Sequence, residues 1–416
     1  MKKIFFLVLF IWAFTNLSRA QNVLALNKEG TADQDEEYVI LNPAGKLIKV
    51  LSGVDIKIHA ENLICAYDDK TKKMGYISME TGEWAIKPQF ENVYNQHNFS
   101  EGLVVVEKEF EKGVTKSAIY DKTGKLILPF CDWIISDYSD GLAIVETTGY
   151  QFGAIDKTGK LVIPFSLGKL NDFHNGLAIK GNNKEYVDAY ADETGLWGFI
   201  DKTGKMVIKQ EWSWASAFSE GLAAVQNKQK KWGYINDQGK LVIPCTYENE
   251  VSFSEGLAAV TIATGKADET IMAYIDKTGK QLAKPTYDVI RDFKEGMSAV
   301  VKIEKPGTDD EIYKFGFVDK NFKLVIPIIH EKAVDIGYYL PYFSFTNGLC
   351  PTTKGYIDKT GKLVISFPDA SFISPEPFSN GFAFVKVFYT ESSYLMMIDT
   401  KGKILWKSKP IKIMAG

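Results

Sequence analysis

One phrase recurs along the chain, and this repetition limits the possible folds more than any other feature of the sequence. The phrase reads aromatic-Ile-Asp-Lys-Thr-Gly-Lys-Leu-Val-Ile-Pro. Clear copies occupy residues 154–164, 199–208, 234–244, 274–284, 317–327 and 356–365, and weaker copies occupy residues 38–48, 76–86, 119–129 and 397–406. Successive copies lie 35 to 45 residues apart. This regularity predicts about ten similar small units, each stacked on the next.

A second phrase, Phe-Ser-Glu-Gly-Leu-Ala-Ala-Val, accompanies the first. Its glycines are Gly102, Gly141, Gly176, Gly221, Gly256, Gly296, Gly348 and Gly381, and an aromatic residue lies three positions before each of them. Residues 61–63 are interpreted as a degenerate first copy. The count is therefore ten hairpin phrases but nine Gly-Leu phrases, so one half unit lacks a partner. We expect this half unit either to cap an open stack or to close a ring by pairing the two termini.

The chemistry of each unit predicts a three-stranded antiparallel meander. Gly-Leu-Ala-Ala-Val, Trp-Gly-Tyr-Ile and Lys-Leu-Val-Ile are short apolar runs of residues that favour strands. The Asp-Lys-Thr-Gly segment between the last two predicts a type I turn closed by a left-handed glycine. The proline after the last run is expected to end its strand, because proline has no N–H to donate. Residues 247–253 are a candidate for a short fourth strand.

The predicted fold class is all-β, a tandem array of about ten three- to four-stranded antiparallel meanders. Propeller-like stacking is favoured, with the Gly-Leu strands innermost, where small residues allow close packing. The alternative is an open β-solenoid. Propellers typically have about 4–8 blades, so ten units would form a large ring, an open array or two groups.

Two segments resemble a known family. Residues 196–201 (Leu-Trp-Gly-Phe-Ile-Asp) and 231–236 (Lys-Trp-Gly-Tyr-Ile-Asn), each followed by Gly-Lys and later by Glu-Gly-Leu-Ala-Ala-Val, resemble the WG repeat family of bacterial proteins. The tryptophan is present in these two copies only. The resemblance implies a repeat fold and no particular activity. Residues 397–406 also look like blades of quinoprotein-type propellers, which favours a radial arrangement of sheets.

The first twenty residues have the pattern of a signal peptide. Lys2 and Lys3 precede an apolar run at residues 4–14, and small residues at Ser18 and Ala20 predict cleavage before Gln21. An uncleaved anchor is the alternative. The expected organisation is a signal peptide at 1–20 and the repeat array at 21–416, in a secreted, periplasmic or cell-surface protein. No later run approaches about 18 apolar residues, so no transmembrane segment is expected after cleavage.

Charge and motif content offer no support for catalysis or for nucleic-acid binding. The chain has 49 Lys plus Arg and 52 Asp plus Glu, a formal net charge of -3. The four histidines show no metal-ligand spacing, and no nucleophile motif is present. We therefore expect no catalytic residue, no metal and no cofactor. Cys65, Cys131, Cys245 and Cys350 are interpreted as separate buried thiols, although export would permit a bridge whose pairing the sequence does not assign.

Departures from the repeat are the best candidates for function, since binding residues concentrate on loops over a rigid scaffold. The insertions at residues 181–193, 304–311 and 330–345 are polar, acidic or aromatic. The candidate binding residues are Trp214, Tyr186, Tyr190, Tyr338, Tyr339 and Tyr342, while Trp212 is assigned to the core. The predicted function is non-catalytic binding or scaffolding, with a protein or glycan partner at the cell envelope. The alternative is a carbohydrate-binding protein or hydrolase with a site in a central channel or on the aromatic rim.

Overall fold

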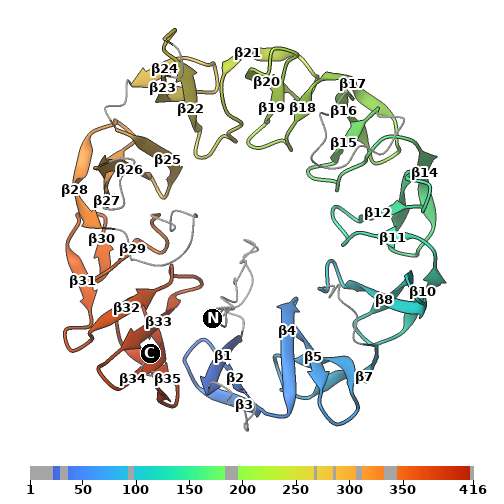
Figure 1. The fold of residues 1–416 in the computed structure, drawn as a ribbon, viewed down its shortest axis with the longest axis horizontal. Coiled ribbons are helices and arrows are strands. Elements are labelled where there is room, and N and C mark those ends of the chain that lie inside the picture. Colours follow the sequence, from blue (N-terminus) through green and yellow to red (C-terminus); the bar gives the residue numbers. More distant parts are fainter. Residues whose placement is uncertain are drawn as a thin grey trace.

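The computed structural model describes residues 22–28, 36–91, 98–182, 195–266, 269–283, 287–305, 312–331 and 344–412. These residues form ten separate antiparallel sheets of three to five strands. Figure 1 shows the sheets following one another around a common axis, with the first sheet beside the last. The predicted all-β, propeller-like array is confirmed, and the open solenoid is excluded. Across the described residues no helix is long and apolar enough to span a bilayer.

The sheets are called blades and numbered along the chain. Blade 1 contains β1 (Val23–Lys28), β2 (Glu37–Leu41) and β3 (Leu47–Leu51); blade 2 contains β4 (Val54–Ala60), β5 (Leu63–Asp68), β6 (Lys73–Ser78) and β7 (Trp84–Phe90); blade 3 contains β8 (Leu103–Glu111), β9 (Val114–Asp121) and β10 (Leu126–Cys131); blade 4 contains β11 (Ile134–Ile135), β12 (Leu142–Glu146), β13 (Phe152–Asp156) and β14 (Leu161–Ser166); blade 5 contains β15 (Leu177–Gly181), β16 (Trp197–Asp201) and β17 (Met206–Trp212).

The second half of the ring repeats this pattern. Blade 6 contains β18 (Trp214–Ala215), β19 (Leu222–Gln226), β20 (Trp232–Asn236) and β21 (Leu241–Tyr247); blade 7 contains β22 (Leu257–Ala263), β23 (Thr270–Asp276) and β24 (Gln281–Ala283); blade 8 contains β25 (Val289–Lys294), β26 (Met297–Glu304), β27 (Ile312–Asp319) and β28 (Leu324–Glu331); blade 9 contains β29 (Leu349–Thr352), β30 (Gly355–Asp358) and β31 (Leu363–Ser366); blade 10 contains β32 (Phe372–Pro375), β33 (Phe382–Phe388), β34 (Ser392–Asp399), β35 (Ile404–Lys407) and β36 (Ile411–Lys412).

The prediction that proline ends the outer strand is wrong. β21 continues through Pro244 to Tyr247, and β14 continues through Pro164 to Ser166. These strands lie at the outer rim of the ring (Figure 1), where one edge has no neighbouring strand. A proline in an edge strand costs no ladder hydrogen bond and discourages pairing with another chain.

The fourth strand occurs, but not at residues 247–253. Tyr247 ends β21, and blade 7 has three strands. The equivalent segments of other blades do form it, since β11, β18 and β25 precede the Gly-Leu strand and pair with it on its inner side. In blade 7 the side-chain Oδ1 of Asn249 accepts a hydrogen bond from the Thr261 N–H, which takes the place of a strand pair. The Gly-Leu strand is therefore innermost only in the three-stranded blades.

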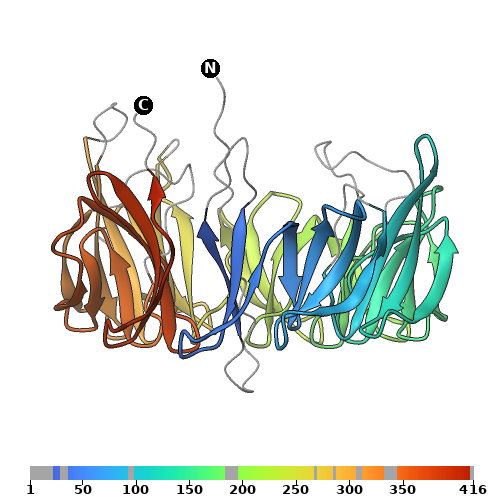
Figure 2. The same cartoon turned by 90° about the horizontal axis from the view of Figure 1, so that it is seen from below.

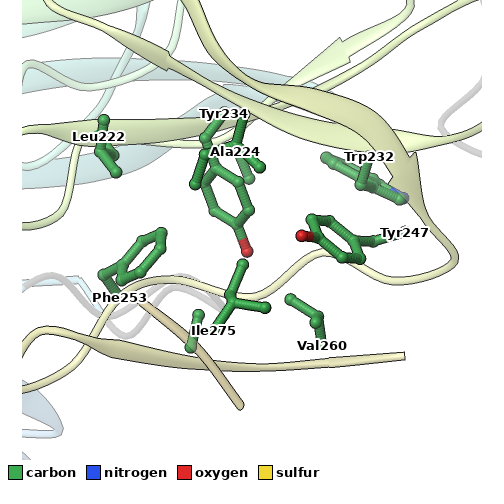
Figure 3. Close-up of a cluster of buried hydrophobic side chains, with 10 residues drawn as sticks. Leu222, Ala224, Trp232, Tyr234, Tyr247, Phe253, Val260 and Ile275 are labelled. Atoms are coloured by element: carbon green, nitrogen blue, oxygen red, sulfur yellow. The ribbon is translucent and has the colours of Figure 1, made fainter. Parts of the chain in front are cut away.

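Cores lie between blades rather than within them. Figure 3 shows Ala224, Trp232 and Tyr234 of blade 6 facing Val260 and Ile275 of blade 7. Phe253, which leads into blade 7, meets the Tyr234 ring edge-on at a centroid distance of 4.9 Å. Since each sheet buries both of its faces against its neighbours, no blade has a core of its own.

Ring closure also departs from the prediction. The first hairpin is not an unmatched half, because β1 supplies its third strand. Among the described strands, none of blade 1 pairs with one of blade 10. Blade 1 stacks on blade 10 through a buried cluster that includes Val39, Leu41 and Phe384. The Lys409 N–H donates to the Asn27 carbonyl oxygen at 3.1 Å, and Lys409 Nζ lies 2.8 Å from Glu37 Oε1. Apolar packing and a few polar contacts thus close a ring of ten blades.

Candidate functional site: the two faces of the ring

Because neighbouring strands of a blade are antiparallel, each connection between strands lies at one of the two ends of the ring. The Asp-Lys-Thr-Gly turns and the Ser-Glu-Gly turns lie at one end, which we call the constant face. The hairpins between the first two long strands of each blade, and the links from the outer strand to the next blade, lie at the other end, which we call the variable face. The described strands β15, β26 and β28, which lead into the insertions at 181–193, 304–311 and 330–345, end at the variable face.

Turns on the constant face are built alike. In blade 5 the Asp201 carboxylate accepts hydrogen bonds from Thr203 N, Thr203 Oγ1 and Lys205 N at 2.9, 2.6 and 3.1 Å. These bonds, above all the one from the Thr203 hydroxyl, hold the pKa of the Asp201 carboxyl below its usual range. Gly204 adopts a φ of +83°, as a left-handed turn position requires. The predicted turn is confirmed.

A polar staple joins neighbouring blades on the constant face. Glu255 of blade 7 accepts a hydrogen bond from Gly296 N of blade 8 at 2.9 Å, and Lys320 Nζ of blade 8 donates to the Glu255 carbonyl oxygen at 3.2 Å. Six junctions share this arrangement of an acid, a glycine N–H and a lysine: Glu61 with Gly102 and Lys122, Glu101 with Gly141 and Lys157, Asp140 with Gly176 and Lys202, Glu220 with Gly256 and Lys277, Glu255 with Gly296 and Lys320, and Glu295 with Gly348 and Lys359.

The staples explain why the Ser-Glu-Gly and Asp-Lys-Thr-Gly phrases recur together. Each acid is at a positive φ of 50–55°, in the turn that precedes the Gly-Leu strand. A half-exposed ion pair contributes only about 0.2–1 kcal/mol, so the staples set the register between blades more than they stabilise them. The turns of the constant face therefore have a structural role, which is to hold neighbouring blades in register.

Exposed aromatic residues occur only on the variable face within the described residues. They are Phe110, Tyr150, Trp214 and Phe372, each 40–49% exposed. The large exposed residues elsewhere are aliphatic and mostly begin the outer strands, as Leu126, Leu241 and Leu363 do. Figure 2 shows the ring edge-on, with the long β8–β9 hairpin (teal) rising beyond the other blades at one end. Phe110 lies near the tip of this hairpin, between Lys108 and Lys116.

Of the predicted binding residues, Trp214 is exposed as expected. It is 41% exposed, and its ring lies 5.8 Å from that of Trp197 in blade 5. Trp212 packs, partly buried, against the buried cluster between blades 5 and 6 that contains Trp197, as predicted. Its Nε1 atom is buried and has no hydrogen-bond partner among the described residues. Tyr186, Tyr190, Tyr338, Tyr339 and Tyr342 lie outside the described residues. The sequence reading overlooked Phe110 and Phe372, since neither lies in an insertion.

A buried lysine was also overlooked. Lys180 is 8% exposed, and its Nζ donates to the Gly168 carbonyl oxygen at 2.6 Å. Burial lowers the pKa of its ammonium group to about 8. The equivalent residue in six other blades is a buried valine: Val106, Val145, Val225, Val260, Val300 and Val385. The signal was present in the sequence, because Lys180 stands four residues after Gly176 of the Gly-Leu phrase.

Groups that could serve chemistry are isolated from one another. The described residues contain no group of three or more His, Cys, Asp or Glu side chains that could hold a metal ion. All four cysteines are free, and burial raises the pKa of the Cys65 thiol to about 12. Burial also raises the pKa of the Glu376 carboxyl to about 7, and no other described carboxylate hydrogen-bonds with it.

Comparison with known proteins identifies the repeat. A family described as "WG containing repeat" matches residues 74–109, 152–179, 197–230, 232–263, 272–305 and 355–387. These matches cover parts of blades 2, 3, 4, 5, 6, 7, 8, 9 and 10. No curated protein matches the sequence.

Several solved structures are similar to this chain to different degrees. One described as the crystal structure of the eukaryotic initiation factor is 10% identical, covers 95% of this chain and 96% of that chain, and has a TM-score of 0.51. BamB from Moraxella catarrhalis is 10% identical over 68% of this chain and 89% of that chain, with a TM-score of 0.35. Hsv2p of Kluyveromyces lactis is 10% identical over 72% of this chain and 97% of that chain, with a TM-score of 0.31. At such identity the first likeness shows the fold alone.

Proposed function

We propose that this chain, which belongs to the WG repeat family, is a non-catalytic scaffold that binds a protein partner through its variable face. The distribution of exposed aromatic residues carries this proposal. Phe110, Tyr150, Trp214 and Phe372 are all on the variable face, whereas the turns of the constant face are occupied with staples. Aromatic side chains dominate the energetics of protein interfaces because they bury a large area at low entropic cost.

Rigidity supports the same conclusion. A ring whose sheets bury both faces holds its variable-face loops at fixed separations, and a partner that spans several blades then loses little entropy in ordering them. The N-terminal pattern at residues 1–20 favours action outside the cytoplasm, at the cell envelope or in the periplasm. Mass measurement of the mature protein after export tests this location, with Gln21 as the expected first residue.

Site-specific photo-crosslinking distinguishes the two faces. A photoreactive phenylalanine analogue is placed singly at Phe110, Tyr150 or Phe372 on the variable face, and at Lys125, Lys205 or Lys362 on the constant face. We expect adducts of one discrete protein mass from the variable-face positions and none from the constant-face positions. Equal adducts from both faces, adducts from the constant face alone, or no adducts at all would contradict the proposal. A hydrolytic activity of the purified protein, or specific glycan binding without protein adducts, would instead favour the carbohydrate alternative.

A further inference from the structure

Two junctions between blades lack a polar link on the constant face. Six junctions carry staples, and two others have different links there. Between blades 1 and 2, Asn22 Nδ2 donates to the Met79 carbonyl oxygen at 2.9 Å, and between blades 9 and 10, Gly381 N donates to Asn347 Oδ1 at 3.4 Å. Among the described residues, no hydrogen bond or ion pair on the constant face joins blade 5 to blade 6 or blade 10 to blade 1. Figure 1 shows these two junctions, called 5/6 and 10/1, on opposite sides of the ring.

Three side chains that link other blades are replaced at the 5/6 junction. Asn175 stands in place of the acid and Asp237 in place of the lysine, so no staple forms. His174 stands in place of a serine whose hydroxyl, at four other junctions, donates to a carbonyl oxygen of the next blade. Ser219 Oγ, for example, donates to the Phe253 carbonyl oxygen at 2.9 Å. All three polar contacts are thus absent from one junction.

Packing at the constant-face end of the 5/6 junction is also looser. The aromatic residue that precedes each Gly-Leu phrase packs against the previous blade. At seven junctions this residue is only 0–3% exposed: Phe99, Tyr138, Phe173, Phe253, Phe293, Phe345 and Phe378. Phe218, at the 5/6 junction, is only partly buried, although its ring lies 5.0 Å from that of Phe199 in blade 5. Blade 1 has no Gly-Leu phrase, so the 10/1 junction has no equivalent aromatic residue.

Both junctions are instead held together on the variable face. A single residue, Ser213, connects β17 of blade 5 to β18 of blade 6 at this face. The rings of Trp197 and Trp214 lie 5.8 Å apart across the same end of the 5/6 junction. At the 10/1 junction, the ion pair between Lys409 and Glu37 is also on the variable face, because Glu37 follows the β1–β2 hairpin. Each junction can therefore pivot at its variable-face end and open at its constant-face end.

We propose that the ring bends along the line that joins the 5/6 and 10/1 junctions, with blades 1–5 and blades 6–10 moving as two halves. The links on the variable face act as pivots, and gaps open on the constant face. Polar links on the constant face join all the blades within each half. The separations between variable-face loops of one half therefore stay fixed, and only the angle between the halves changes.

Apolar packing limits the size of this bend. The cluster across the 5/6 junction includes Trp197 near the variable face and Phe218 near the constant face. A small tilt about the variable-face end keeps the contacts of Trp197 and loosens those of Phe218, which is already partly exposed. Because a local opening that exposes little apolar surface costs little free energy, the 5/6 junction yields before the stapled junctions do.

The bend has a consequence for binding. Opening of the constant face tilts the two variable faces toward each other, so Phe110 in one half approaches Phe372 in the other. A partner held between the halves favours the bent state, because it contacts both halves only there. This consequence rests on the proposed function, whereas the hinge itself does not.

Distances between spin labels test the hinge in the full chain. Labels are attached through an unnatural ketone amino acid to pairs of exposed turn positions two blades apart on the constant face, and double electron–electron resonance gives each distance distribution. The pair Lys160 and Lys240 spans the 5/6 junction. The matched pairs, Lys125 with Lys205 and Lys240 with Lys323, span stapled junctions only. We expect the distribution of the Lys160–Lys240 pair to be broader and to extend to longer distances than those of the matched pairs.

Restoring the missing links should remove this difference. His174→Ser, Asn175→Glu and Asp237→Lys together supply the side chains found at other junctions. We expect the combined variant to narrow the Lys160–Lys240 distribution to the width of the matched pairs. Equal widths in the unaltered chain, or a Lys160–Lys240 width that the combined variant leaves unchanged, would overturn the proposal.

Removing a staple elsewhere is the converse test, and it decides the matter if the combined variant does not fold. Glu255→Asn with Lys320→Asp removes the staple between blades 7 and 8 and should broaden the Lys240–Lys323 distribution. An unchanged width in this folded variant would contradict the role given to the staples.

Labels across the opposite junction test the second pivot. The pair Lys362 and Lys46 spans the 10/1 junction and should also be broad, and a width equal to that of the matched pairs would contradict a bend along the line joining both junctions. All these distributions are recorded without a partner. Failure of the hinge therefore leaves the crosslinking test of the proposed function untouched, and failure of that test leaves the hinge standing.

Discussion

Replacing Gly233 by alanine is expected to destabilise the protein by about 3 kcal/mol or more. A Cβ atom at Gly233 would lie 2.5 Å from the Ile243 carbonyl oxygen and 2.8 Å from Cys245 N, both main-chain atoms of β21. Since φ at Gly233 is not positive, the whole penalty arises from this close approach of two strands. Urea-induced unfolding followed by tryptophan fluorescence measures the effect as a lower midpoint.

A matched glycine separates crowding from backbone strain. Gly256 has a φ of +85°, and a Cβ there would meet nothing within 4 Å. Gly256→Ala is therefore expected to cost about 1 kcal/mol from strain alone. A Gly233→Ala variant as stable as Gly256→Ala would show that the two strands are not in the close contact described.

Lys180→Val is expected to stabilise the protein at neutral pH by about 2–3 kcal/mol. Valine fills the equivalent position in six blades, and the change removes a buried ammonium group whose Nζ is bonded to the Gly168 carbonyl oxygen. Loss of that hydrogen bond offsets a part of the gain, because the carbonyl oxygen is left without the lysine donor.

The pH dependence of this effect has a definite sign. Because burial lowers the pKa of Lys180 to about 8 in the folded state, the unfolded chain binds the proton more tightly. The stability of the unaltered protein should therefore rise between about pH 8 and pH 10.5 relative to Lys180→Val, and the advantage of the variant should shrink over that range. The measurement is the difference in urea midpoint between the two proteins at several pH values. An advantage that stays constant from pH 7 to pH 10.5 would contradict a depressed pKa.

Local chemistry accounts for what could be predicted. The Asp-Lys-Thr-Gly turn is determined by Asp201 and Gly204 within five residues, so its geometry follows from the sequence alone. The position of Trp212 in the repeat, which Phe90 and Tyr247 occupy in other copies, predicted its place in the core, and Trp214 is exposed as a candidate binding residue should be. In contrast, β1 carries none of the repeated phrases, and its place in blade 1 depends on pairing with β2.

Contacts between residues far apart in the sequence could not be predicted from the sequence alone. Glu61 and Lys122 are 61 residues apart, and only the stacking of blade 3 on blade 2 brings them together. The sequence does contain a sign of this pairing. Where Asn175 replaces the acid of a staple, Asp237 replaces its lysine, and where Asn347 replaces the acid, Thr400 replaces the lysine. The acid and the lysine are thus absent together. A comparison of each Ser-Glu-Gly phrase with the Asp-Lys-Thr-Gly phrase of the following blade would have revealed that the acid and the lysine occur together.

Ring closure is tested most directly by zero-length crosslinking. A carbodiimide joins a carboxylate to an amine only when the two are in contact, and Glu37 and Lys409, 372 residues apart, lie 2.8 Å apart across the seam of blades 1 and 10. In the monomer, mass spectrometry should find the Glu37–Lys409 link together with staple links such as Glu101–Lys157, whose atoms lie 3.0 Å apart. Staple links without the Glu37–Lys409 link, or that link only between two copies of the chain, would contradict a closed ring of ten blades.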